Sequence, residues 1–434
     1  MNEMKESGIQ WIGTYPAAWK LKKIKYCLQE RVEKNNPIKT RDILSLTAKQ
    51  GVIPIEEKEG GGNKPKEDVS AYRLAHPGDI VMNSMNILSG SVGLSKYYGC
   101  VSPVYYMLRP IEQGEDVRFY NYIFQTTVFQ RSLFGLGNGI LIKESSNGKL
   151  NTIRMRISMD KFGNLFIPVA PFDVQKKISD YLDNKCEEID GLLADLQSQV
   201  DYLEEYKRAK IKEIVTLGLE GNVKLKESSI EWVGEIPEHW NVHPVYSYFS
   251  ERKNKNRLGL EENLLSLSYG NVIRKDINTS DGLLPESFNT YNIVEAGDII
   301  IRPTDLQNDK RSLRTGLVKE HGIITSAYID LMPVEKVDSR YFRYLLHSYD
   351  CMKVFYNMGN GVRQGLNYSE FSRLMVIEPP YDEQVKIADY LDEKVSEIDE
   401  IINDKNNQIL SVEDYKKTLI YEYVTGKKEA PANE

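Results

Sequence analysis

Cysteine, histidine and tryptophan are scarce in this chain of 434 residues, which contains four, five and four of them. The cysteines (Cys27, Cys100, Cys186 and Cys351) lie far apart and form no CxxC pair, so neither a disulfide framework nor a zinc ribbon is expected. With so few thiol and imidazole ligands, we predict no metal site and a reducing compartment, the cytoplasm.

Long apolar runs are missing as well. No run approaches the roughly 18 residues that span a membrane. The opening residues MNEMKE lead into no apolar segment, so we expect no secretory signal. Apolar residues make up 41% of the chain, which is enough for real cores, and its length predicts two to three domains.

Signatures of common catalytic sites are also absent, since there is no Walker A lysine, no GxSxG and no HExxH. The run GLGNG at 135–139 lacks the spacing of a dinucleotide-binding loop. The run EPPY at 378–381 resembles the motif of amino-methyltransferases, which need Asp, Asn or Ser first to accept a hydrogen bond from the target amine. We interpret it as a turn before a helix, and we predict that the chain is not an enzyme and holds no cofactor.

Charge is unevenly distributed along the chain. The net charge is −7, yet segments 176–220 and 383–429 carry −4 and −5, which leaves the remainder at +2. A slightly basic remainder is compatible with DNA binding, although no strongly basic run marks a footprint.

The sequence contains an internal repeat of two copies. Residues 6–19 match 227–240 at seven of fourteen positions, and residues 175–190 match 384–399 at 11 of 16. Between these anchors, Leu-Ser-Leu, Gly-Asp-Ile and Gly-Asn-Gly triplets recur in the same order in both copies. A gene duplication is the simplest account. It predicts an internal pseudo-two-fold and the divisions 1–174 (domain), 175–220 (helix), 221–382 (domain) and 383–434 (helix).

The two shorter segments carry a heptad seam. In the first segment apolar residues recur from Ile178 to Leu203 in steps of three and four, and the second repeats the pattern 209 residues later with Lys405 in place of Leu196. Prolines precede both segments, and Asp173 and Asp382 are candidate N-caps. Because the first helix leads out from one domain and the second leads back, we expect an antiparallel coiled coil. The alternative is two amphipathic helices that pack on separate domains.

The repeated domains read as α+β. Short strands are expected at 80–82 and 299–301, helices at 117–130 and 340–349, and packing roles for the four tryptophans. Two loop zones carry different polar residues in the two copies. Residues that read different bases are expected to differ in this way. Arg can pair with guanine and Asn or Gln with adenine, whereas Lys can neutralise phosphate. The candidate DNA-binding residues are Asn83, Ser84, Asn86, Ser89, Ser91, Asn138, Lys143, Arg154 and Arg156 in copy one, and Arg302, Thr304, Asp305, Gln307, Asn308, Arg311, Arg314, Asn360, Arg363, Gln364 and Asn367 in copy two.

The anchor S-G-I-Q-W-I-G-x-x-P-x-x-W at 7–19 and its copy at 228–240 resemble the opening of target recognition domains in type I restriction-modification specificity subunits, the HsdS family. The ending P-x-x-x-Q-x-x-I-x-x-Y-L-D at 171–183 and 380–392 resembles theirs too. The resemblance implies two recognition domains, each reading half of a bipartite site in double-stranded DNA, joined by helices that set the gap. It also implies two modification subunits, which bind S-adenosylmethionine, and restriction subunits, which cut DNA using ATP; no membrane is involved.

Two other functions stay open on the sequence. An adenine-specific methyltransferase would bind S-adenosylmethionine in the isolated chain. A coiled-coil scaffold unrelated to DNA would show no salt-dependent affinity for DNA.

Overall fold

The computed structural model describes residues 3–47, 50–58, 65–87, 90–137, 143–144, 150–151, 156–278, 287–304, 306, 313–358 and 365–431. The chain has mixed helix and strand content and divides into two compact units. Unit 1 comprises residues 1–196 and 407–434, and unit 2 comprises residues 197–406. Each unit therefore contains one repeated domain together with half of each long helix.

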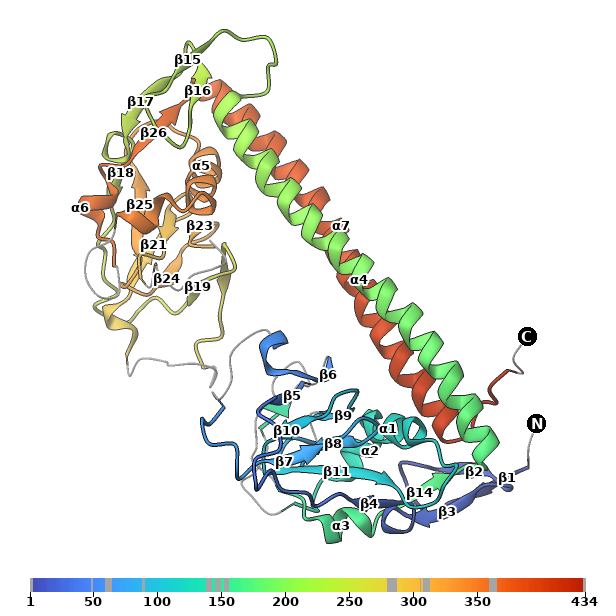
Figure 1. Ribbon diagram of the computed structural model, residues 1–434. Helices are drawn as coiled ribbons and strands as arrows, with labels where there is room; N and C mark the ends of the chain where they lie inside the picture. The colour runs from blue at the N-terminus through green and yellow to red at the C-terminus, as the bar shows by residue number, and fades with distance from the viewer. Residues whose placement is uncertain are drawn as a thin grey trace. The chain divides into compact units, whose positions relative to one another are not determined.

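The domain of unit 1 is built mainly from short strands (Figure 1). In chain order its elements are β1 (Met4–Glu6), β2 (Thr14–Pro16), β3 (Lys20–Lys23), η1 (Ile24–Tyr26), β4 (Leu28–Glu30), β5 (Leu44–Thr47), β6 (Gly51–Pro54), η2 (Ile55–Glu57), β7 (Arg73–Ala75), β8 (Ile80–Asn83), β9 (Val92–Leu94), β10 (Gly99–Val101), β11 (Tyr105–Pro110), α1 (Val117–Gln125), α2 (Thr127–Ser132), β12 (Lys143–Glu144), β13 (Leu150–Asn151), α3 (Met159–Gly163) and β14 (Phe166–Val169).

The domain of unit 2 follows a closely matching order. Its elements are β15 (Leu225–Glu227), β16 (Glu235–Pro237), β17 (Asn241–Pro244), η4 (Val245–Ser247), β18 (Phe249–Glu251), β19 (Leu265–Ser268), β20 (Asn271–Arg274), η5 (Phe288–Thr290), β21 (Asn292–Val294), β22 (Ile299–Ile301), β23 (Thr315–Leu317), β24 (Gly322–Ile324), β25 (Ile329–Pro333), α5 (Ser339–Cys351), η6 (Val354–Asn357), α6 (Tyr368–Phe371) and β26 (Met375–Glu378). The main sheet has the order β4-β11-β8-β9 in unit 1 and β18-β25-β22-β23 in unit 2, antiparallel in both.

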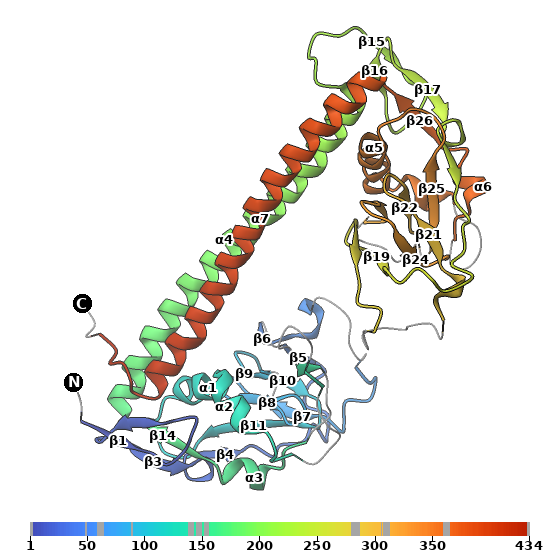
Figure 2. The same ribbon diagram turned by 180° about the vertical axis from the view of Figure 1, so that it is seen from behind.

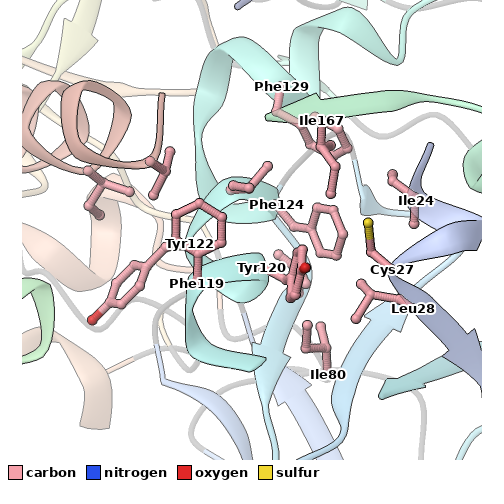
Figure 3. Close-up of a cluster of buried hydrophobic side chains, with 14 of the residues drawn as sticks. Ile24, Cys27, Leu28, Ile80, Phe119, Tyr120, Tyr122, Phe124, Phe129 and Ile167 are labelled. Carbon is pink, nitrogen blue, oxygen red and sulfur yellow. The ribbon is translucent and has the colours of Figure 1, made fainter. Parts of the chain in front are cut away.

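Alternate residues of each sheet face two different cores, as the pleat of a strand requires. Ile80 and Met82 of β8 face the large core beneath α1 and α2, whereas Val81 faces a smaller core with β5 and β6. Figure 3 shows the large core of unit 1, where Phe119, Tyr120 and Phe124 of α1 meet side chains from η1, β4 and β8. Unit 2 divides its β22 residues in the same way.

The strands expected at 80–82 and 299–301 are present, and so is the helix expected at 340–349. The helix expected at 117–130 is interrupted at Thr126, whose backbone is extended and whose hydroxyl donates to the carbonyl of Ile123. Trp11, Trp19 and Trp240 are buried in the cores, so the packing role expected for tryptophan is confirmed at these positions.

The two long helices are α4 (Phe172–Leu217) and α7 (Tyr381–Val424). Both start before the predicted N-caps: Gln175 donates its backbone N–H to the carbonyl of Pro171, and Gln384 does the same to Pro380. Asp173 and Asp382 therefore lie inside the first turn, and the N-cap assignment is wrong. Their charge still favours the positive end of the helix dipole.

Within each unit the two helix segments run antiparallel and side by side (Figures 1 and 2). In unit 1 the rings of Tyr181 and Tyr423 lie 4.6 Å apart, and Lys416 pairs with Asp190 at 2.6 Å. In unit 2 Lys207 pairs with Asp399 at 2.7 Å. Most residues of the seam are buried, including Leu182 and Leu391 at 0% exposure.

Candidate nucleic-acid interface

The first candidate zone follows a central strand of the main sheet in each unit. It begins with Asn83, the last residue of β8, in unit 1 and with Arg302, directly after β22, in unit 2. A Gly-Asp turn before each strand is held by a buried carboxylate. Asp79 accepts from Arg31 at 2.8 Å, and Asp298 accepts from Arg252 at 2.7 Å. The turn that enters each of these strands is therefore anchored in the same way in the two units.

The second candidate zone, which follows the Gly-Asn-Gly triplet, returns to the first zone in both units. In unit 1 the backbone N–H of Ile157 donates to the carbonyl of Ser84 at 3.1 Å. In unit 2 Leu366 donates to the carbonyl of Pro303 at 3.0 Å, at the matched place. Two stretches that are more than 60 residues apart in the sequence thus meet beside the end of one strand, as a composite binding surface needs.

The candidate residues differ in how far solvent can reach them. Arg156, Arg302, Thr304 and Asn367 are exposed, Asn83, Asn86 and Ser91 are half-buried, and Ser84 and Arg314 are buried. Lys143 lies in β12, but only its backbone is described. The remaining candidates lie outside the described residues: Ser89, Asn138, Arg154, Asp305, Gln307, Asn308, Arg311, Asn360, Arg363 and Gln364.

Arg314 supports its loop from within. It is 1% exposed, and its guanidinium donates to the carbonyls of Arg302 and Thr304 at 3.1 and 2.6 Å. Its backbone N–H donates to the carboxylate of Asp350 in α5 at 2.9 Å. A guanidinium used in this way holds the loop's shape, so the structure favours a positioning role for Arg314 over direct contact with a base.

Two other candidates also use polar side-chain atoms in hydrogen bonds within their own domain. The Asn367 side chain accepts from the backbone N–H of Glu370 and caps α6 in a capping box. The Ser84 hydroxyl donates to the carbonyl of Val104 at 2.7 Å. Arg302 and Arg156 are therefore the exposed cations of the two zones whose side chains the structure describes.

The histidines of the described residues do not form a metal site. His239 and His243 have an HxxxH spacing, which on a helix would put both rings on one face. Here, however, His239 pairs with Glu383 at 2.8 Å and His243 lies in strand β17. No group of three or more His, Cys, Asp or Glu side chains that could hold a metal occurs in the described part of the chain. Nor is any described helix long and apolar enough to cross a membrane.

The sequence reasoning missed a set of residues in unit 2. Tyr269 and Arg343, together with Arg208 of α4, line one groove in the folded unit. None lies in a zone that the differing polar loops marked out. Their grouping comes from the packing of a hairpin, a helix and α4, and no local sequence pattern indicates it.

Comparison with known proteins gives consistent similarities. A family model described as the type I restriction modification DNA specificity domain matches residues 203–411. A protein of Methanocaldococcus jannaschii named "Putative type I restriction enzyme MjaX specificity subunit" is 24% identical over 384 residues, which cover 83% of this chain and 81% of that protein. The MjaVIII specificity subunit of the same organism is 26% identical over 281 residues, covering 61% and 63%.

Similarity to solved structures concerns the fold. A chain from a study of complex assembly and conformational transition in a type I restriction-modification system has a TM-score of 0.67 and 11% identity. The match covers 95% of this chain and 99% of that one. The mixed helix-and-strand architecture is thus shared over nearly the full length of both chains.

Proposed function

We propose that this chain, which belongs to the family of type I restriction-modification specificity subunits, reads double-stranded DNA in two halves, one with each repeated domain. Specificity subunits of these systems recognise DNA and are not catalytic. The observation that carries the two-half reading is that the two domains share a frame while their loops differ. Arg302 stands where unit 1 has Asn83, and these two residue types favour different bases.

Exchanging one domain tests this proposal. Residues 20–165 would be replaced by the corresponding domain of a relative, and the methylated motif would be sequenced in cells that also express the modification partner. We expect one half of the motif to change and the other half to stay, because unit 2 is untouched. A change in both halves would contradict the proposal.

We further propose that α4 and α7 pair as a coiled coil that sets the gap between the half-sites and completes an internal pseudo-two-fold. The support is a shared antiparallel register: the contacts Lys416–Asp190 in unit 1 and Lys207–Asp399 in unit 2 join matched positions. The borders of the units, after Leu196 and after Asn406, lie within one helical turn of each other in this register. An insertion there leaves the contacts inside each unit intact.

The test is to insert seven residues after Leu196 and seven after Asn406. Seven residues keep the seam in phase and lengthen a helix by roughly 10 Å. Since DNA rises about 3.4 Å per base pair, we expect the unread gap to grow by about three base pairs while both half-site sequences stay the same. The added turn of the duplex should lower activity. An active variant with an unaltered gap would show that the helices do not set the distance.

Matched apolar residues on the helices support docking of two copies of one partner, the modification subunit. Leu192 and Ile401 occupy equivalent places and are 48% and 46% exposed. Tyr206 and Tyr415 form a second matched pair, at 40% and 56%. Equal surfaces suit identical partners, just as unequal loops suit different bases. We place the assembly, with restriction subunits added, in the cytoplasm.

The stoichiometry can be measured by native mass spectrometry of the co-expressed complex. We expect two modification subunits on the unaltered chain. Leu192→Ser should weaken one site and Ile401→Ser the other, leaving one tightly bound copy in each case. If either variant still bound two copies as tightly as the unaltered chain, these residues would not form the docking surface.

A further inference from the structure

Unit 2 contains a groove of about 1270 Å³ between its helix pair and its domain. One wall is formed by α4 and α7, with Arg208 and Asp399 among the lining residues. The opposite wall is formed by the tip of the β19–β20 hairpin and by α5, with Tyr269 and Arg343. Its volume exceeds what a few ordered waters would fill, so it can accept a substantial part of a ligand.

Most charges in the groove pair with each other, and the lining side chains that remain outside these ion pairs are mainly cationic. Lys207 pairs with Asp399 at 2.7 Å and with Glu204 at 3.1 Å. Arg340 is held by three aspartates. Among the described residues Arg208, Arg343 and Lys319 make no ion pair with a carboxylate, and Glu400 is the acidic residue of the lining that remains. The groove thus offers three cations to an anionic ligand.

His347 shows that these cations converge. The pKa of His347 is lowered to about 3, first by burial and then by Arg343, Lys207 and Arg208. Its ring is therefore neutral at physiological pH, and its buried Nδ1 has no hydrogen-bond partner among the described residues. The lowered pKa of His347 thus indicates a positive potential in this part of the groove, which favours an anionic ligand.

The groove reaches the described end of the reading loop of unit 2. Leu313, the residue before Arg314, lines it, and the hairpin tip at Gly270 packs near Leu313. Tyr269 at this tip is 71% exposed and has a φ of 48°, a left-handed conformation that is costly for a tyrosine. Arg343 reaches the same tip, donating to the carbonyl of Gly270 at 3.2 Å. A duplex bound at this end of the loop would therefore lie beside the groove.

We propose that this groove binds the sugar-phosphate backbone beside the half-site that unit 2 reads, with Arg208 and Arg343 each neutralising a phosphate. The proposal rests on the proposed function. Unit 1 differs at both matched positions. Asn121, which is buried, stands where unit 2 has Arg343, and Lys417, which stands where it has Arg208, pairs with Asp414 at 2.8 Å. The two phosphate contacts proposed for this groove therefore have no counterpart in unit 1.

The test measures DNA affinity as a function of salt for the full chain, assembled with its modification subunits, by fluorescence anisotropy on a duplex. The variants are Arg208→Gln and Arg343→Asn, singly and together, with Lys417→Gln as the matched control in unit 1. Each lost phosphate contact should lower the slope of log affinity against log salt by about 0.9. The double variant should therefore lose nearly two, the control should lose nothing, and the methylated motif should not change, since phosphates carry no sequence information.

Several outcomes would overturn the proposal. An unchanged slope in Arg208→Gln is decisive, because no described contact of Arg208 supports the fold and the variant should fold normally. An unchanged slope with weaker binding of the modification subunit would make the groove a protein-docking site. A changed motif would make these residues base readers. A failure of the proposed function would look different from a failure of this proposal. In that case the unaltered chain would show no preference for its own site. The salt dependence of the affinity could still be measured, because it can be determined on any duplex.

Discussion

Units 1 and 2 agree most closely where each domain joins its helices. Arg118 in unit 1 pairs with Asp116, Asp180 and Asp183. Arg340 in unit 2 pairs with Asp338, Asp389 and Asp392. Near these arginines, the side chains of Gln175 and Gln384 each accept from the backbone of their own domain and donate to the carbonyl that lies two residues before the helix. The joint that orients each domain on its helix is thus kept atom for atom.

The two units disagree on the surfaces proposed to meet DNA, and one difference in their cores places a carboxyl group where the other unit has an apolar side chain. Asp330 of β25 lies opposite Ile300 in the sheet, and the matched residue in unit 1, opposite Val81, is Met107. Both residues are buried, at 1% and 0% exposure. Burial first, and then Asp298, raises the pKa of Asp330 to about 8. The two units therefore differ in a residue that affects the stability of the core, as well as in their loops.

Moving the buried carboxyl into unit 1 should have the largest effect. Met107→Asp removes a packed apolar side chain and buries a carboxyl group in a site that is 0% exposed. We expect a loss of more than about 5 kcal/mol, enough to unfold a typical domain. Urea unfolding followed by tryptophan fluorescence would show it, since Trp11 and Trp19 report on unit 1 and Trp232 and Trp240 on unit 2. A variant as stable as the parent would show that this position tolerates charge.

The converse change, Asp330→Met, should stabilise unit 2 and remove a pH dependence. A carboxyl whose folded pKa exceeds its unfolded value of 3.8 costs the folded state increasingly as pH rises from about 4 to about 8. Since tenfold in proton affinity is worth about 1.4 kcal/mol, the gain at pH 8 should be about 3–5 kcal/mol. Unfolding at pH 5 and pH 8 measures it. An equal gain at both pH values would mean that packing, and not ionisation, sets the difference.

At the reading surface, Arg302→Asn gives unit 2 the residue that unit 1 has at this place. If Arg302 pairs with a guanine, the change should weaken binding to the parent site by about 1–3 kcal/mol and relax one position of one half-site. Methylation sequencing and competition binding would detect both effects. A uniform loss on all sequences would instead assign Arg302 to a phosphate.

The joint should show the smallest and most equal effects. The ion pairs of Arg118 and Arg340 are about one-third exposed, so solvent screens them. We expect Arg118→Ala and Arg340→Ala to cost about 1 kcal/mol each, in unit 1 and unit 2 respectively. Thermal unfolding of the two variants compares them directly. If only one of the two variants lost stability, the two joints would not be equivalent.

Local patterns in the sequence determined the repeat, the long helices, the short strands after Gly-Asp turns and the burial of the seam. These features depend on residues a few places apart, through the periods of 3.5 and 2 that helices and strands impose. The same reasoning put Arg314 on the loop surface, because chain position alone does not show that its guanidinium turns inward to two carbonyls of its own loop.

Only the tertiary structure decided which distant residues meet. The N-terminal anchor of unit 1 packs on the end of α7, where Lys427 donates to the carbonyl of Ile12 across more than 400 residues. Sheet register placed Asp330 in a core, and the packing of α5 against α4 gathered Arg343 and Arg208 in one groove. Such contacts follow from the register and packing of whole elements, which no single stretch of sequence encodes.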